Sequence, residues 1–208
     1  MILVRQVPEP IEFDTQVRKP GKTWLSENAD APRPKALWLP FTQTLADGFQ
    51  QRCGYAAMLD PTGGTVDHYL SCKNHPHLAY EWNNYRFVSA TLNASKQNED
   101  DAVLDPYEVQ EGWFEILLPS LQMQVTNSVP AHLRDKAEHT LKRLKLRDGE
   151  RIIRWRRSWF EMYEKGRLTL EGLAEVAPLI AASVTKRDHK ESYGEGAITI
   201  LEGLEAVR

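Results

Sequence analysis

Cysteine is scarce in this sequence, and long apolar runs are absent from it. Cys53 and Cys72 are the only two cysteines among 208 residues. Two thiols in a chain with no export signal are usually reduced, so we expect no disulfide. The opening residues MILVRQVPEP lack the apolar stretch of a signal peptide, and no run approaches the roughly 20 apolar residues of a membrane helix. These absences predict a cytoplasmic protein.

The chain also lacks an excess of positive charge, with 26 lysines and arginines against 29 aspartates and glutamates and a formal net charge of −3. Such a chain has no overall attraction to nucleic acid, so a nucleic-acid partner would need a local basic patch. Residues 134–157 provide one, with ten basic and four acidic side chains. Its candidate nucleic-acid-binding residues are Lys142, Arg143, Arg154 and Arg157. The alternative is an ordinary solvated face, with arginine stems packed on Trp155 and Trp159.

Hydrophobic residues make up 41% of the chain, which is enough for one folded domain with an appended helical part. The prolines of residues 1–32 predict an extended N-terminal arm, and the polar start of residues 185–208 predicts a flexible tail. Between them we expect a core at residues 33–128 and a helical C-terminal region at residues 129–184. The predicted fold class is therefore α+β.

Within the core, the four-residue spacing of apolar residues predicts a helix over residues 35–53. The turn signal Asp-Pro-Thr-Gly-Gly at residues 60–64 predicts a hairpin whose second strand leads directly to an Asp-His pair. We expect a strand around residues 85–88, a helix over residues 90–97, and two further strands within residues 113–125. Apolar periodicity predicts C-terminal helices over residues 130–146, 150–165 and 169–182.

The residues that indicate a chemistry are Asp67, His68, Asn84, Asn93 and Lys96. Hydrolysis of a phosphodiester needs a general base for water and a divalent cation that neutralises charge on the phosphate. Magnesium takes only one or two protein oxygens, and the Asp67 carboxylate with the Asn93 amide oxygen meets that need. Neutral His68 would be the base, with its Nδ1 held by a partner that fixes the tautomer. Asn84 would hold the surrounding loop, and Lys96, one turn after Asn93, would reach a phosphate oxygen.

The order and spacing of these residues, 16 positions from His68 to Asn84 and 9 from Asn84 to Asn93, resemble the HNH endonuclease motif. The resemblance covers about residues 50–110 and implies a ββα-metal fold with a small antiparallel sheet. By this resemblance, His68 is the general base and Asn84 is the structural middle asparagine. Asp67 and Asn93 are then the ligands of Mg²⁺ or Mn²⁺.

The wider pattern of CGY, YEWNNYR and LDPYE is similar to bacterial HNH proteins that are encoded beside an ATPase in anti-phage systems of the Septu and retron kinds. That similarity implies a DNA-cutting effector of antiviral defence. It also implies an ATPase as a protein partner.

One feature of many HNH proteins is missing. They carry two Cys-x-x-Cys pairs that bind a structural zinc, and here only Cys53 occupies one of those positions. The other three positions hold Ala56, Ser89 and Leu92. We expect no structural zinc, because a tetrahedral site needs four ligands. A second zinc hypothesis, built on Cys72, His75 and His77, lacks a fourth ligand, so this loop is expected to shape the substrate entrance instead.

Two functions are therefore open. The first is a metal-dependent endonuclease that acts on DNA in preference to RNA. The second is a catalytically inactive HNH scaffold that serves as a nucleic-acid or protein interaction module. Glu81 and Asp105 are either groups that support the site from behind its ligands or ordinary surface acids, and we favour the second.

Overall fold

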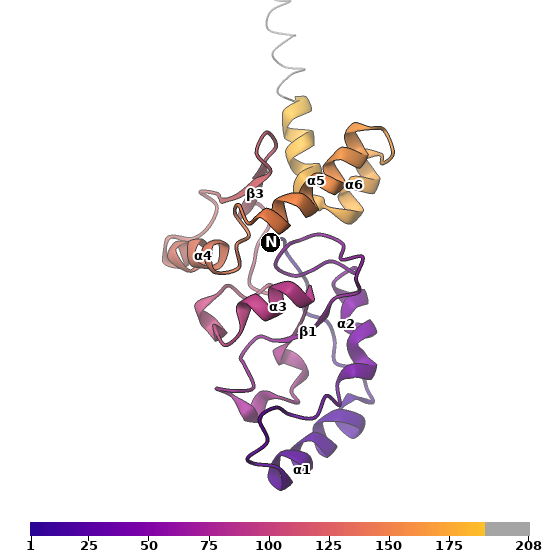
Figure 1. Cartoon of the computed structure of the whole chain (residues 1–208), viewed down its shortest axis with the longest axis vertical. Coiled ribbons are helices and arrows are strands. Elements are labelled where there is room, and N and C mark those ends of the chain that lie inside the picture. Colours follow the sequence, from indigo (N-terminus) through magenta and orange to yellow (C-terminus); the bar gives the residue numbers. More distant parts are fainter. Residues whose placement is uncertain (190–208) are drawn as a thin grey trace, which may run out of the picture.

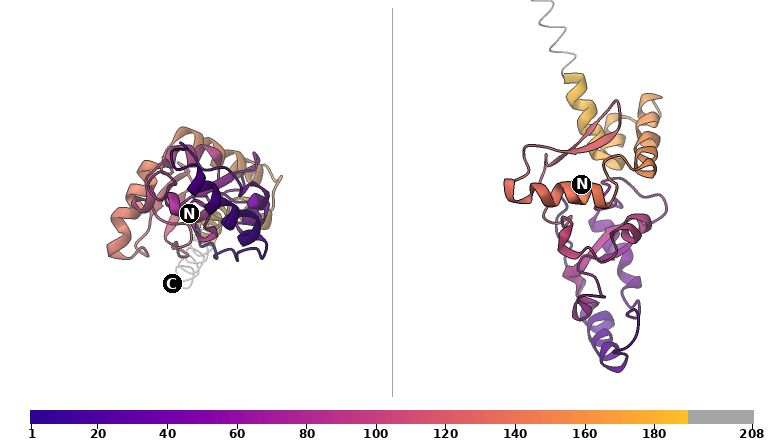
Figure 2. Two further views of the ribbon diagram at one scale, coloured as in Figure 1. Left: turned by 90° about the horizontal axis from the view of Figure 1, so that it is seen from below. Right: turned by 60° about the vertical axis from the view of Figure 1, so that its left-hand side comes forward.

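The computed structural model describes residues 1–189, and its α+β fold agrees with the fold class predicted from the sequence. Its helices are α1 (Lys19–Glu27), α2 (Thr42–Gly48), α3 (Ala90–Lys96), α4 (Ala131–Arg143), α5 (Glu150–Glu164) and α6 (Leu170–Val176), followed by helical residues 178–189. Its strands are β1 (Thr65–His68), β2 (Tyr85–Val88), β3 (Phe114–Leu117) and β4 (Gln122–Val125). The molecule is elongated, with α1 at one end and residues 178–189 at the other (Figure 1 and Figure 2). Within residues 1–189, every helix is too short or too polar to cross a lipid bilayer.

Each of the two sheets is one antiparallel pair of strands, β1 with β2 and β3 with β4. In the first pair, Asp67 lies opposite Arg86. The predicted turn before β1 is present, with a φ of +57° at Gly64, where a Cβ atom would lie 2.4 Å from the Phe87 ring. The predicted hairpin across this turn is wrong, because β1 pairs with β2, beyond residues 69–84.

The N-terminal segment differs in part from the extended arm predicted over residues 1–32. Residues 1–10 have no regular structure, but residues 14–18 form a π-helical turn that continues into α1. This helical segment is stabilised by burial of Phe13 and Val17. Pro20 lies at the second position of α1, directly after the π-helical turn.

Helix α2 is shorter than the predicted helix over residues 35–53. A 3-10 turn, Leu39–Phe41, precedes it, with Pro40 in its first turn. Gln50 and Gln51 follow with φ values of +54° and +59°, so the chain cannot continue as a right-handed helix.

The predicted helix over residues 169–182 is divided into α6 and the helical residues 178–189. The break is at Ala177, which precedes a proline, and a proline disfavours the helical region for the residue before it. Of the predicted flexible tail, residues 185–189 are helical, and residues 190–208 lie outside the described residues.

Two apolar clusters fill the interior. One lies between α2 and the β1–β2 pair, and it contains Phe13, Trp82 and Tyr85 in mutual edge contacts. The other joins α3 and the β3–β4 pair to the C-terminal helices. Buried Arg156 crosses the second cluster and donates hydrogen bonds to the carbonyls of Leu121 and Leu146 at 2.8 and 2.7 Å. The meeting point of β1 and α3 lies between the two clusters.

Candidate active site

Strand β1 and helix α3 bring the predicted site residues together. Ser89 caps α3, and its Oγ accepts a hydrogen bond from the Leu92 N–H at 3.3 Å. The helix then returns across β1, where Asn93 Nδ2 donates to the Val66 carbonyl over 3.3 Å. Asn93 therefore lies beside the strand that carries Asp67 and His68.

Asp67, His68 and Asn93 line one open cleft of about 810 Å³. Part of the lining comes from α1 and the segment that connects it to α2, including Trp24, Asn28, Arg33 and Trp38. The rest comes from β1, α3 and the segments that follow them, including Ser71, Cys72, Lys73 and Gln97. Three residues that the sequence analysis selected thus share a single cavity.

Asp67 lies at the floor of this cleft and is 2% exposed. Its Oδ1 is 3.1 Å from Lys96 Nζ, and its Oδ2 is 3.5 Å from the Tyr55 hydroxyl. Burial raises the pKa of Asp67 above its ordinary value, and the charge of Lys96 limits the rise. Oδ2 therefore has the longer and weaker of the two contacts.

His68 is held by a main-chain carbonyl. Its Nε2 lies 2.9 Å from the Ala79 oxygen, which also accepts a hydrogen bond from the Tyr85 hydroxyl at 2.8 Å. The ring also contacts Trp38 edge-on, with 4.5 Å between ring centroids. Burial lowers the pKa of His68 to about 4, so the imidazole is neutral at pH 7.

The predicted orientation of this imidazole is wrong. We expected Nδ1 to be the nitrogen with a fixing partner, but the Ala79 carbonyl lies at Nε2. A carbonyl oxygen only accepts, so Nε2 carries the hydrogen and Nδ1 keeps its lone pair. The basic nitrogen of the ring is therefore Nδ1.

Asn84 is buried and does not line the cleft. Its Oδ1 accepts from the Leu70 N–H at 2.8 Å, and its Nδ2 donates to the carbonyls of Leu70 and Leu78 at 2.9 and 3.3 Å. These bonds tie the backbone after β1 to the turn that carries Ala79. Asn84 thus positions His68 through the main chain.

Lys96 differs from its predicted place. It is completely buried, and its ammonium donates to Asp67 Oδ1 and to the carbonyls of His68 and Tyr69 at 3.0 and 2.8 Å. These three acceptors use all three ammonium hydrogens, which leaves none for the expected contact with a phosphate oxygen. The helix face that places Asn93 at β1 also carries Lys96 to the two carbonyls at the end of that strand.

Comparison with models of known protein families finds no match for this chain, and comparison with curated proteins finds none either.

A zinc site is not evident in the part of the chain that the structure describes, where no three His, Cys, Asp or Glu side chains are grouped to hold a metal. Cys53 is buried, and its sulfur accepts a hydrogen bond from the Ser89 N–H at 3.2 Å. His75 lies 3.6 Å from Asp100 Oδ2. A magnesium ion would still be compatible with the cleft, because it needs few protein ligands and accepts an amide oxygen such as that of Asn93.

The basic helices α4 and α5 flank α3. Arg143 Nε lies 2.6 Å from Glu99 Oε1, just beyond α3, and Arg151 donates to Thr91 Oγ1 at 2.9 Å. The four predicted nucleic-acid-binding residues differ in their surroundings. Arg143 and Arg154 are ion-paired, with Glu99 and Glu150, whereas Lys142 and Arg157 are exposed without an ion pair to any described residue.

Several contributors to the site were not found from the sequence. Trp38 and Tyr55 lie outside the Asp-His-Asn-Asn spacing, and only the folded chain shows that they contact His68 and Asp67. Asp105 is also not the expected surface acid, because it is buried in a bidentate ion pair with Arg86. Arg86 is opposite Asp67 in the register, so this pair supports the strand under the site.

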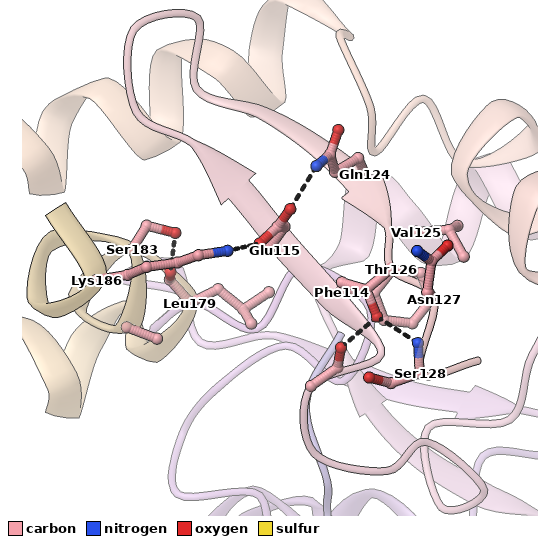
Figure 3. Close-up of a pocket in the computed structure, with 12 residues that line it drawn as sticks. Phe114, Glu115, Gln124, Val125, Thr126, Asn127, Ser128, Leu179, Ser183 and Lys186 are labelled. Carbon is pink, nitrogen blue, oxygen red and sulfur yellow. Dashed lines mark hydrogen bonds and ion pairs between the residues drawn. The ribbon is translucent and has the colours of Figure 1, made fainter. Parts of the chain in front are cut away.

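Another cavity, of about 520 Å³, lies between the β3–β4 pair and residues 178–189 (Figure 3). Lys186 Nζ lies 2.8 Å from Glu115 Oε2 there, and Thr126 Oγ1 donates to the Gly112 carbonyl (Figure 3). Its lining among the described residues contains no histidine, cysteine or aspartate. The first cleft is therefore the candidate active site.

Proposed function

We propose that the protein is a metal-dependent endonuclease of the HNH type, in which β1, β2 and α3 form a ββα-metal core. The observation that carries the proposal is the cleft that joins Asp67, His68 and Asn93. A neutral imidazole, a carboxylate and an amide oxygen on one surface are the groups that phosphodiester hydrolysis with a hard cation requires.

The donor set fits magnesium or manganese. Among the described residues, Asp67 Oδ2 has only the 3.5 Å contact with the Tyr55 hydroxyl. Asn93 is held through its Nδ2, and no described residue donates a hydrogen bond to its Oδ1. Asp67 and Asn93 would hold the cation through these two oxygens. When bound, the cation would neutralise charge on the phosphate and on the departing 3′ oxygen.

His68 performs the proton transfer in this proposal. Its Nδ1 lone pair takes a proton from a water molecule while the water oxygen bonds to phosphorus and the bond from phosphorus to the 3′ oxygen breaks. The Nε2–H group donates to the Ala79 carbonyl throughout. This carbonyl also stabilises the positive charge of the imidazolium as it forms. Asn84 and Lys96 are positioning residues, since both act through the backbone around β1.

DNA is the proposed substrate, and basic residues of α4 and α5 would hold its backbone without reading sequence. The proposed role as an anti-phage effector with an ATPase partner is supported only by the resemblance of residues 50–110 to such proteins.

Plasmid nicking with Mg²⁺ or Mn²⁺ tests the enzyme. The His68→Ala variant is expected to lose about 10²- to 10⁴-fold in rate, the usual contribution of a general base. His77→Ala is the matched control, because His77 is exposed and does not line the cleft. Equal nicking by wild type and His68→Ala, or no cleavage of either plasmid or single-stranded DNA by wild type with and without its ATPase partner, would favour the inactive scaffold instead.

A further inference from the structure

The cleft has features that specify the form of nucleic acid it would accept. With the proposed nuclease as its basis, we infer that the substrate enters as an unpaired strand and that Trp24 stacks on one of its bases.

The size of the cleft favours a single strand. Its volume of about 810 Å³ is that of a cavity for a small molecule or a few linked groups. A B-form duplex, whose major and minor grooves are about 12 and about 6 Å wide, is much larger than such a cavity. Asp67 is 2% exposed at the floor, and half-buried His68 lies against Trp38, so a phosphate must enter the cleft to reach them.

Two tryptophans, Trp24 and Trp38, line the cleft. Proteins that bind single strands stack bases on aromatic rings, which works for any sequence because every base has a π face. Trp38 is engaged with His68, Tyr80 and Tyr85. Trp24 is half-buried in the cleft lining and has no ring or cation contact with another described residue. Its indole is therefore the available stacking surface.

The cleft lining also carries basic side chains without ion pairs. Arg33, between α1 and α2, and Lys73, after β1, are exposed in the cleft lining. Neither is ion-paired to a described residue. Among the described residues, Asp67 is the only acid in the lining, and Lys96 compensates its charge. The cleft thus combines unpaired cations with an aromatic platform, as single-strand grooves do.

Amide side chains complete the lining. Gln97 and Asn98 lie directly after α3, and their side chains make no hydrogen bond to a described residue. They are available to the exposed edges of an unpaired base, which a duplex would hide.

Binding and cleavage are tested separately. The His68→Ala protein is titrated with a short fluorescent DNA strand, the same strand as RNA, and the DNA duplex, without divalent metal. We expect either single strand to bind at least about 10-fold more tightly than the duplex. Trp24→Ala in the same background should weaken single-strand binding about 10-fold, the scale of one stacking contact. Trp24→Phe should restore most of it, and Leu39→Ala, an exposed apolar residue outside the lining, should change nothing.

The outcomes distinguish the inference from the proposed function. Equal binding and equal Mg²⁺-dependent cleavage of strand and duplex by wild type would overturn the inference and leave the nuclease standing. Trp24-dependent binding of a single strand without any cleavage would support the inference and overturn the nuclease. Tighter binding of the DNA strand than of the RNA strand, with both tighter than the duplex, would support the inference for DNA, and the reverse order would support it for RNA.

Discussion

The ammonium of Lys96 lies 3.1 Å from Oδ1 of Asp67, and both side chains are buried. The pair joins the end of α3 to the end of β1, and its cation also binds the carbonyl of His68. One lysine therefore compensates a buried carboxylate and fixes the backbone of the neighbouring base.

Replacing Lys96 by methionine is expected to destabilise the fold by about 3–5 kcal/mol, because it leaves the Asp67 carboxylate buried without its cation. The free energy of unfolding in urea measures this loss. Lys142→Met is the control, since Lys142 is exposed on α4, and it should change stability by less than about 0.5 kcal/mol. A Lys96→Met protein as stable as the control would contradict the ion pair.

The pKa of His68 predicts how the stability of metal-free protein depends on pH. The folded-state pKa of about 4 lies below the ordinary value of 6.5, so the unfolded chain binds more protons between these values. Stability due to His68 is fully present above pH 6.5 and is lost as the pH falls toward 4, by up to about 3 kcal/mol. Urea unfolding in EDTA across this range should show a smaller pH dependence for His68→Gln than for wild type, and parallel curves would refute the shift.

Asn84→Ala should destabilise the protein by about 1–3 kcal/mol, because the partly buried N–H of Leu70 loses its acceptor. Nicking should fall as well, since the turn that holds His68 is released. Asn83→Ala is the neighbouring control, because Asn83 is exposed and makes its side-chain bond only with Gln6 among the described residues. Differential scanning calorimetry and the nicking rate together check both effects, and unchanged nicking by Asn84→Ala would remove its positioning role.

Asn93→Ala is expected to abolish stabilisation by divalent metal while leaving the metal-free protein folded. Wild type at about 100 times the dissociation constant of Mn²⁺ should gain about 2.7 kcal/mol. Ser95→Ala is the control, because Ser95 is half-buried on the same helix, donates its hydroxyl to the Thr91 carbonyl and does not line the cleft. Thermal unfolding with and without Mn²⁺ measures the shift, and a full shift in Asn93→Ala would reject this residue as a ligand.

The exposed cations of α4 and α5 should control the salt dependence of DNA binding. Lys142→Gln and Arg157→Gln are each expected to lower the slope of log affinity against log salt by about 0.7 for single-stranded DNA, the loss of one phosphate contact. Arg156→Gln should instead unfold the protein, since Arg156 is 1% exposed and holds main-chain carbonyls. Binding isotherms at several salt concentrations check the first expectation, and unchanged slopes would leave these helices as solvated faces.

The sequence predicted those parts of the fold that depend on neighbouring residues. The turn before β1, the strand at residues 85–88 and the helix from Ala90 follow from local residue preferences, and the structure contains all three. The helix over residues 14–27 was missed because its stability comes from burying Phe13 and Val17 against distant aromatic residues. Local propensity carries no signal for such contacts.

The candidate site was predictable to a similar extent. The spacing selected Asp67, His68 and Asn93, which share the cleft. It did not determine the direction of the Lys96 ammonium, because a long side chain on that helix face can reach either a ligand or the strand beneath. The contact of Trp38 with His68 joins residues that are far apart in the sequence, and only the folded chain brings them together.

The hydrogen bond from His68 to the Ala79 carbonyl has a consequence for engineering and for natural variation. The acceptor belongs to the main chain, so exchanging the side chain at position 79 does not by itself remove it. Moving the proton to the other imidazole nitrogen would require a new path for the backbone of the Pro76–Leu78 turn. The protonation pattern of the base is thus set by the path of the backbone and not by a side-chain acceptor.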